Sequence, residues 1–279
     1  MSGAPRAGMA VDRDTAAVAI EMAGLTRRFG SLTAVDHVDL AVPAGTVFGL
    51  VGRNGAGKST MLKMLTTLLP PSEGTARVVG FDVVRRPREV RKRIGYVPQL
   101  LSADGGLTGF ENLMVFARLY DVPRSERTRR IAEALESMGL EQAADQPVRQ
   151  YSGGMIRRLE IAQGLLHHPA VLFLDEPTVG LDPVARRVVW EDIRRLRRRL
   201  GTTVLLTTHY LEEADELCDQ VAILHLGRLV AAASPADLKT RAGAATLEDA
   251  FVHFTGDSIE TGGAYREAGR TRRTVRRLG

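Results

Sequence analysis

The chain has 279 residues, 44% of them hydrophobic, which is enough for one large or two small domains. It contains no apolar run near the roughly 18 residues of a membrane span, no signal-peptide core, and a single cysteine, Cys218, which excludes an internal disulfide. The net charge of +5 equals that of residues 264–279 alone, where six arginines accompany one glutamate. We therefore expect a cytoplasmic chain with a charge-balanced body and no nucleic-acid partner.

Residues 1–17 are rich in alanine, glycine and charge without periodicity, which predicts a disordered segment. Residues 18–25 predict an extended segment, and residues 34–42 alternate apolar and polar side chains like a half-exposed antiparallel strand. Phe29, between them, has two interpretations: a ring stacked on a nucleotide base, or a core residue. Its spacing alone favours the core.

The next stretch places a short buried strand, a glycine-rich loop and a helix in succession. Residues 46–51 predict the strand, and apolar residues from Met61 to Leu69 keep helical spacing until Pro70 ends the run. Between them lies the motif G-x-x-x-x-G-K-[ST], formed by Gly52, Arg53, Asn54, Gly55, Ala56, Gly57, Lys58, Ser59 and Thr60.

This motif is typical of the phosphate-binding loop of nucleotide triphosphatases. Its glycines permit a tight turn in which backbone N–H groups point at phosphate oxygens. Lys58 would bring its charge to the β- and γ-phosphates, and the Ser59 hydroxyl suits Mg²⁺. Because the following helix would also aim its N-terminus at the anion, the context favours a nucleotide site over a chance glycine-rich turn.

Residues 75–80 predict a strand, and residues 94–99 predict another that runs into a loop, where the role of Gln99 is ambiguous from the residues alone. Residues 100–150 carry helical signals only, with Ser125 as a possible N-cap. We predict a helical insert within an α/β domain, part of whose surface could dock a partner. The residues at helical spacing are Phe110, Leu113, Phe116, Leu119, Ile131, Leu135 and Met138.

Two further polar groups lie next to regular elements. Ser152, Gly153 and Gly154 begin a predicted helix, where a hydroxyl and bare N–H groups can bind an anion, although Ser152 could equally be an ordinary N-cap. Asp175 and Glu176 end the apolar strand 171–174, at the edge where open α/β sheets bind ligands. Asp175 would serve a metal, and Glu176, on the other side of the chain, would polarise a water molecule.

The last predicted elements extend the sheet. The buried strand over residues 202–208 ends at His209, which therefore shares the sheet edge of Asp175. Residues 221–230 predict a hairpin that closes the sheet.

Taken in order, these motifs resemble the ATP-binding-cassette ATPase family over residues 18–235. The resemblance implies an α/β fold with a phosphate-loop (RecA-like) core, an antiparallel β subdomain and a helical insert at about 100–155. The chain departs from the common signature at Tyr151, Met155 and Arg53, but the serine and both glycines are kept, so phosphate contact is expected to survive. The matching series is the phosphate loop, Gln99, Ser152-Gly153-Gly154, Asp175-Glu176, Gly180-Leu181-Asp182 and His209.

The resemblance also implies roles for these residues. Phe29 would stack on adenine, Gly52 and Asn54 to Thr60 would wrap the phosphates, and His209 would contact the γ-phosphate. Glu176 would be the catalytic base. Mg²⁺ would be held by Ser59, Gln99 and Asp175.

In this family two cassettes face each other head to tail around two ATP molecules. Ser152, Gly153 and Gly154 of one would then touch the ATP bound by the other, with Asp182 across the same interface. Two copies of this chain would make both sites competent, since none of the catalytic residues is missing.

Residues 246–256, together with residues 151–155 followed by Arg157 and Arg158, more narrowly resemble the daunorubicin-type drug-resistance exporters. This implies an ATPase subunit that powers efflux of a hydrophobic drug or antibiotic through a separate transmembrane permease, at the cytoplasmic face of the membrane. Export of lipid or polysaccharide, import, and a non-transport role on ribosomes or DNA are the alternatives; the single cassette without heptads disfavours the last. Residues 236–263 would form a C-terminal extension, and residues 264–279 a basic disordered tail, which could instead touch anionic lipid.

Overall fold

The computed structural model describes residues 17–100 and 102–256. Residues 1–16 of the predicted disordered N-terminal segment and the whole of the predicted basic tail lie outside the described residues. Within the described part, no helix is both long enough and apolar enough to cross a bilayer. The limits predicted for the domains stay predictions.

A six-stranded sheet forms the centre of the fold, in the order β10-β9-β3-β8-β7-β6. Neighbouring strands from β9 to β6 run parallel, and β10 pairs antiparallel with β9, which confirms the predicted closing hairpin. The carboxyl ends of β3, β8, β7 and β6 therefore meet at one edge. The strands are β3 (Val47–Val51), β6 (Ile94–Val97), β7 (Val171–Asp175), β8 (Thr203–Thr208), β9 (Gln220–His225) and β10 (Arg228–Ala233).

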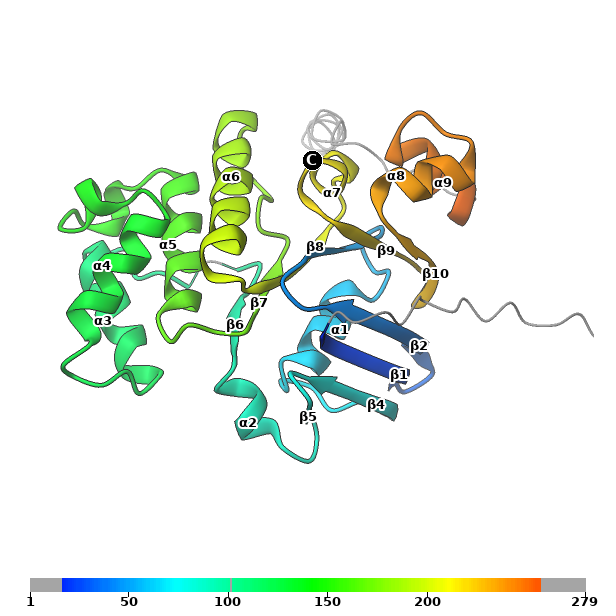
Figure 1. Ribbon diagram of the computed structural model, residues 1–279, viewed down its shortest axis with the longest axis horizontal. Coiled ribbons are helices and arrows are strands. Elements are labelled where there is room, and N and C mark those ends of the chain that lie inside the picture. Colours follow the sequence, from blue (N-terminus) through cyan, green and yellow to red (C-terminus); the bar gives the residue numbers. More distant parts are fainter. Residues whose placement is uncertain (1–16, 101, 257–279) are drawn as a thin grey trace, which may run out of the picture.

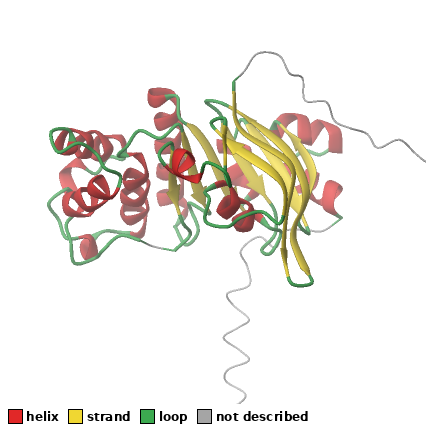
Figure 2. Ribbon diagram, turned by 90° about the horizontal axis from the view of Figure 1, so that it is seen from below, coloured by secondary structure: helices red, strands yellow, loops and turns green. Residues whose placement is uncertain are grey.

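A second, antiparallel sheet has the order β2-β1-β4-β5 and confirms the predicted β subdomain. In Figure 1 it lies on the far side of the molecule from the helical insert, and Figure 2 shows the strands gathered apart from the insert helices. Its strands are β1 (Val18–Phe29), β2 (Leu32–Pro43), β4 (Glu73–Val78) and β5 (Phe81–Asp82).

Alternation along the central strands gives the protein two hydrophobic clusters. Phe48 and Leu50 of β3 face the cluster shared with the antiparallel sheet and helix α1 (Lys58–Leu65), whereas Val47 and Val51 face the cluster shared with the helices that follow β6. Because both faces are covered, β3 reads as a continuous apolar run in the sequence, as parallel strands do.

Helix α1 (Lys58–Leu65) is shorter than its sequence predicts. The apolar spacing indicated a helix that continues to Leu69, but the Thr66 hydroxyl donates back to the Leu62 carbonyl at 2.8 Å and Thr67 has a left-handed φ of 65°. The helix ends in a Schellman motif, in which left-handed Thr67 donates to the Met64 carbonyl and Leu68 donates to the Lys63 carbonyl. Leu68 is consequently 61% exposed.

The helical insert is confirmed, and it packs α3 (Gly109–Leu119) and α4 (Arg127–Ser137) against α5 (Gly153–Leu165). Thr108 caps α3 in a reciprocal capping box with Glu111. The predicted cap at Ser125 is wrong, because α4 begins one residue later than that cap would allow, behind Glu126, and no side chain caps it.

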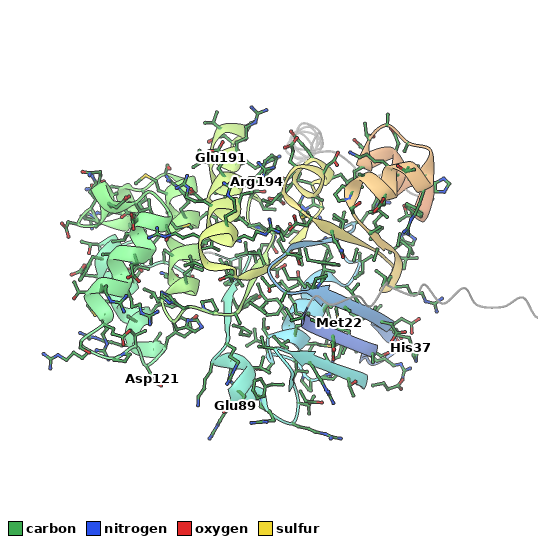
Figure 3. All side chains as sticks on the ribbon, viewed as in Figure 1. Met22, His37, Glu89, Asp121, Glu191 and Arg194 are labelled. Atoms are coloured by element: carbon green, nitrogen blue, oxygen red, sulfur yellow. The ribbon has the colours of Figure 1, made fainter. Side chains whose placement is uncertain are left out.

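The remaining helices complete the layers around the sheet. Arg194 of α6, labelled in Figure 3, reaches the Glu216 carbonyl at the end of α7. In α9, Leu247, Ala250 and Phe251 are buried in the same cluster as α6 and α7. These helices are α2 (Pro87–Arg91), α6 (Pro183–Leu200), α7 (Leu211–Leu217), α8 (Pro235–Ala242) and α9 (Leu247–Thr255).

Candidate active site

The carboxyl edge of the central sheet brings the predicted site residues together. The phosphate-loop motif follows β3, Asp175 ends β7, and His209 follows β8, so three adjacent parallel strands deliver them to one place. Gln99 follows β6, the next strand along, and its side chain is exposed. Ligands of open α/β sheets bind at this edge.

The phosphate loop has the backbone that its glycines permit. Gly57 has φ +103° and immediately precedes α1; a Cβ there would lie 2.4 Å from the Ala34 carbonyl oxygen, so only glycine fits. Lys58 follows as the first helical residue and is 4% exposed. Its Nζ donates to the carbonyls of Gly52 at 2.7 Å and Arg53 at 3.2 Å, which holds the positive charge inside the curve of the loop.

Glu176 is buried beside two basic side chains. Its Oε1 lies 3.4 Å from Nζ of Lys58, and its Oε2 lies 2.9 Å from Nδ1 of His209. Its backbone has a left-handed φ of 49°, which is uncommon outside glycine and is held by two hydrogen bonds from its N–H, to the carbonyl and the hydroxyl of Thr207. The surroundings thus fix both the position and the direction of this carboxylate.

The charges in this cluster perturb one another. Burial lowers the pKa of Lys58, against the raising influence of Glu176 and Asp175. Burial alone would raise the pKa of Glu176, but the hydrogen bond from His209 and the charge of Lys58 outweigh it, so its pKa is lowered. Glu176 is therefore a carboxylate at neutral pH and can accept a proton from water.

Asp175 presents its side chain to different partners from those of Glu176, as the sequence predicts for adjacent acids. The hydroxyl of Ser59 donates to Oδ1 of Asp175 at 3.0 Å, and the Thr207 hydroxyl donates to the same oxygen at 2.6 Å. Ser59 and Asp175 thus offer two oxygen donors beside the phosphate loop, and oxygen is the ligand that Mg²⁺ prefers.

The other predicted residues lie at chain turns and helix ends. Ser152 caps α5 by accepting from the Met155 N–H at 3.3 Å, and Asp182 caps α6 by accepting from two N–H groups at 2.9 Å. Both are exposed, and Gly153 between Ser152 and buried Gly154 is exposed too. Phe29 is 44% exposed, with the Arg27 guanidinium 4.7 Å from its ring centroid, so the core interpretation is wrong and stacking on adenine stays a prediction.

Comparisons with known proteins agree with this geometry. The family profile described as ABC transporter matches residues 35–179. The chain belongs to the ATP-binding-cassette transporter family. This cassette is accordingly an ATPase, and its fold is the phosphate-loop fold with an antiparallel subdomain that the sequence predicts.

Its relatives include proteins named for drug resistance and proteins named for export. The chain is 49% identical to the daunorubicin/doxorubicin resistance ATP-binding protein DrrA of Streptomyces peucetius, over 82% of this chain and 69% of that protein. It is 44% identical to the Nod factor export ATP-binding protein I of Sinorhizobium fredii, over 84% and 68%. Among solved structures, the dimeric ATP-binding cassette MJ0796 bound to ADP and Pi matches with a TM-score of 0.67 and 26% identity, over 77% of this chain and 98% of that chain.

Three residues of the cassette's site escaped the sequence analysis. Thr207 positions both acids, but it is one of three threonines in strand β8, and no sequence signal distinguishes it from the other two. Arg157 lies in helix α5, most of whose residues are buried, and its charge in such a helix is the one sequence signal of a role in the site. Glu213 of α7 is buried completely and accepts hydrogen bonds from Thr178 and Trp190, each at 2.8 Å, so it ties α7 to the segment after Glu176.

Replacing Glu213 with glutamine should make thermal stability less dependent on pH. Burial raises the pKa of Glu213 above its ordinary value of 4.5, against hydrogen bonds from Thr208, Thr178 and Trp190. A raised folded pKa means that full stability is present below the unfolded pKa and is lost as pH rises through the folded pKa. Melting curves should show a Tm advantage for Glu213→Gln that widens from pH 5 to pH 8, by about 2–4 °C per kcal/mol of removed charge penalty. A variant that melts lower than wild type by the same margin at every pH would contradict this.

Proposed function

We propose that the cassette is the ATP-hydrolysing subunit of an exporter and drives efflux of a hydrophobic drug or antibiotic through a separate membrane-spanning permease. The observation that carries the hydrolytic part is the buried carboxylate of Glu176, held between Lys58 and His209 at the end of the phosphate loop. The drug-export part is supported by the 49% identity to the daunorubicin/doxorubicin resistance protein. It follows from this proposal that the cassette acts at the cytoplasmic face of the membrane, through the permease.

In the proposed reaction, Glu176 removes a proton from a water molecule that attacks the γ-phosphorus of ATP in line with the leaving ADP oxygen. Lys58 and the loop N–H groups stabilise the charge on the phosphate oxygens, and His209 contacts the γ-phosphate. Ser59, Asp175 and Gln99 would hold Mg²⁺, which supplies charge neutralisation at the β- and γ-phosphates when bound.

A second copy of the chain would complete each site. Ser152 and Gly153 are exposed at the N-terminus of α5, where they leave N–H groups and a hydroxyl available to the phosphate of a facing cassette. The likeness to a dimeric cassette solved with ADP and phosphate supports this arrangement. Asp182 would lie across the same interface.

The helical insert is the surface that we assign to the permease. Val115 and Leu119, one turn apart on α3, are 45% and 69% exposed, and Leu100, which precedes the insert helices in the chain, is 82% exposed. Neighbouring exposed apolar side chains such as Val115 and Leu119 are typical of interaction sites. Export of lipid or polysaccharide stays the second candidate, and a relative named for export of a cargo other than a drug, Nod factor, is 44% identical to this chain.

The test is co-purification of tagged Glu176→Gln cassette with ATP from its native cell, followed by mass spectrometry. We expect a polytopic membrane protein in stoichiometric amount. Adding Leu119→Glu in the insert should release it, whereas Leu68→Glu, which alters a similarly exposed leucine after α1, should not. Recovery of ribosomal proteins or nucleic acid without a membrane partner would contradict the export assignment and leave the ATPase assignment standing.

A further inference from the structure

Arg157 is a buried arginine whose donors reach three backbone carbonyls in two separate segments of the chain. It lies in the second turn of α5 and is 4% exposed. Its Nε donates to the Pro177 carbonyl at 2.8 Å, one Nη donates to the Pro98 carbonyl at 2.8 Å, and the other donates to the Asp175 carbonyl at 3.0 Å. A planar guanidinium is suited to fixing several acceptors at once, because its donors leave in set directions.

Glu160 makes this arrangement tolerable inside the protein. It lies one turn further along α5, is 1% exposed, and accepts from Nη1 of Arg157 at 3.1 Å. Its other oxygen accepts from the backbone N–H and the hydroxyl of Ser102. Burying a charge costs free energy unless the charge is paired and hydrogen-bonded, and Arg157 and Glu160 meet both conditions.

The acceptors of Arg157 surround the catalytic residues without including any catalytic side chain. Asp175 and Pro177 are the two neighbours of Glu176, and Pro98 immediately precedes Gln99. The helix that carries Arg157 starts at Ser152, the residue proposed to face the second cassette. One side chain therefore joins the helix of the trans-acting residues to the segments of the base and of Gln99.

We propose that Arg157 is a positioning residue that couples the orientation of α5 to the positions of Glu176 and Gln99. The rate of ATP hydrolysis would then depend on the orientation of α5. This rests on the proposed hydrolytic function, and not on the identity of the cargo. Arg157 touches no part of the phosphate loop in its hydrogen bonds, so its loss should spare ATP binding. It should instead disturb the left-handed backbone at Glu176, which its two neighbours' carbonyls help to hold.

The test compares Arg157→Lys and Arg157→Gln with Arg158→Lys in the full chain. Arg158 is the matched control, because its Nη1 donates at 3.0 Å to the Met138 carbonyl in the insert. Lysine keeps the charge but cannot span three carbonyls. We measure kcat and KM for ATP, binding of a fluorescent ATP analogue, and Tm.

For Arg157→Lys we expect kcat to fall about tenfold to a hundredfold, as for a misplaced catalytic group. KM and the analogue Kd should stay within about twofold of wild type, since ground-state binding is unaffected. The kcat of Arg157→Gln should fall further than that of Arg157→Lys, and Arg158→Lys should keep the wild-type kcat. If Arg157→Gln does not fold, the lysine variant alone decides.

A wild-type kcat in folded Arg157→Lys would overturn the inference, and so would equal losses in kcat and in analogue affinity. An equal fall in the kcat of Arg158→Lys would also overturn the inference, because it would show that any change in α5 lowers the rate. Absence of hydrolysis by the wild-type chain itself would contradict the proposed function, which keeps the two failures distinct.

Discussion

Replacing Glu176 with glutamine should lower the rate of ATP hydrolysis about a thousandfold, the middle of the range for loss of a positioned general base. Glutamine matches the shape of the side chain but cannot accept a proton from water. The lowered pKa of Glu176 keeps the wild-type group ionised at neutral pH, so the variant removes a charge that is present under assay conditions. Phosphate release under saturating ATP measures the effect.

The matched control is Glu191→Gln, the same chemical change at an exposed position of α6, labelled in Figure 3. It should leave the hydrolysis rate at the wild-type value. Glu176→Gln should still bind a fluorescent ATP analogue, because Lys58 and the loop are intact. Hydrolysis within about tenfold of wild type would rule out Glu176 as the base, since general bases contribute more than that.

The sequence predicted the layers of the fold because its signals were local. Apolar runs at β3, β7 and β8 are buried on both faces, and Gly52 to Thr60 lie between a strand and a helix as expected. The errors arose at helix ends. Left-handed Thr67 ends α1 early, and α4 starts behind Glu126 without a side-chain cap instead of being capped by Ser125. Apolar periodicity carries no information on the backbone conformation that ends a helix.

The candidate site divides in the same way. Lys58, Asp175, Glu176 and His209 could be named from the sequence because each ends or begins an element at the same sheet edge. Arg157 could not, since an arginine on a helix is usually solvated and its three acceptors are carbonyls contributed by distant segments. Backbone acceptors have no residue identity, so a network built on them leaves no pattern to recognise.

Replacing Lys58 with alanine should weaken ATP binding by about a hundredfold. The ammonium group is buried inside the phosphate loop, where a charge-assisted hydrogen bond is worth up to about 3 kcal/mol, and each 1.4 kcal/mol is about a tenfold change in Kd. Loss of Lys58 also leaves the buried carboxylate of Glu176 with His209 as its one basic neighbour among the ion pairs of the described residues. Calorimetric titration with ATP under catalytically inactive conditions measures the affinity directly.

The control for this change is Lys63→Ala, because Lys63 lies on the same short helix α1 and is exposed. Both variants lose one lysine from α1, so a general effect of helix composition or net charge would appear in both. We expect wild-type affinity for Lys63→Ala and a Kd raised by about a hundredfold for Lys58→Ala. Near-normal affinity in folded Lys58→Ala would mean that residues 52–60 are not the phosphate-binding loop, because the ammonium group of Lys58 is buried inside the curve of that loop, where it would face the anion.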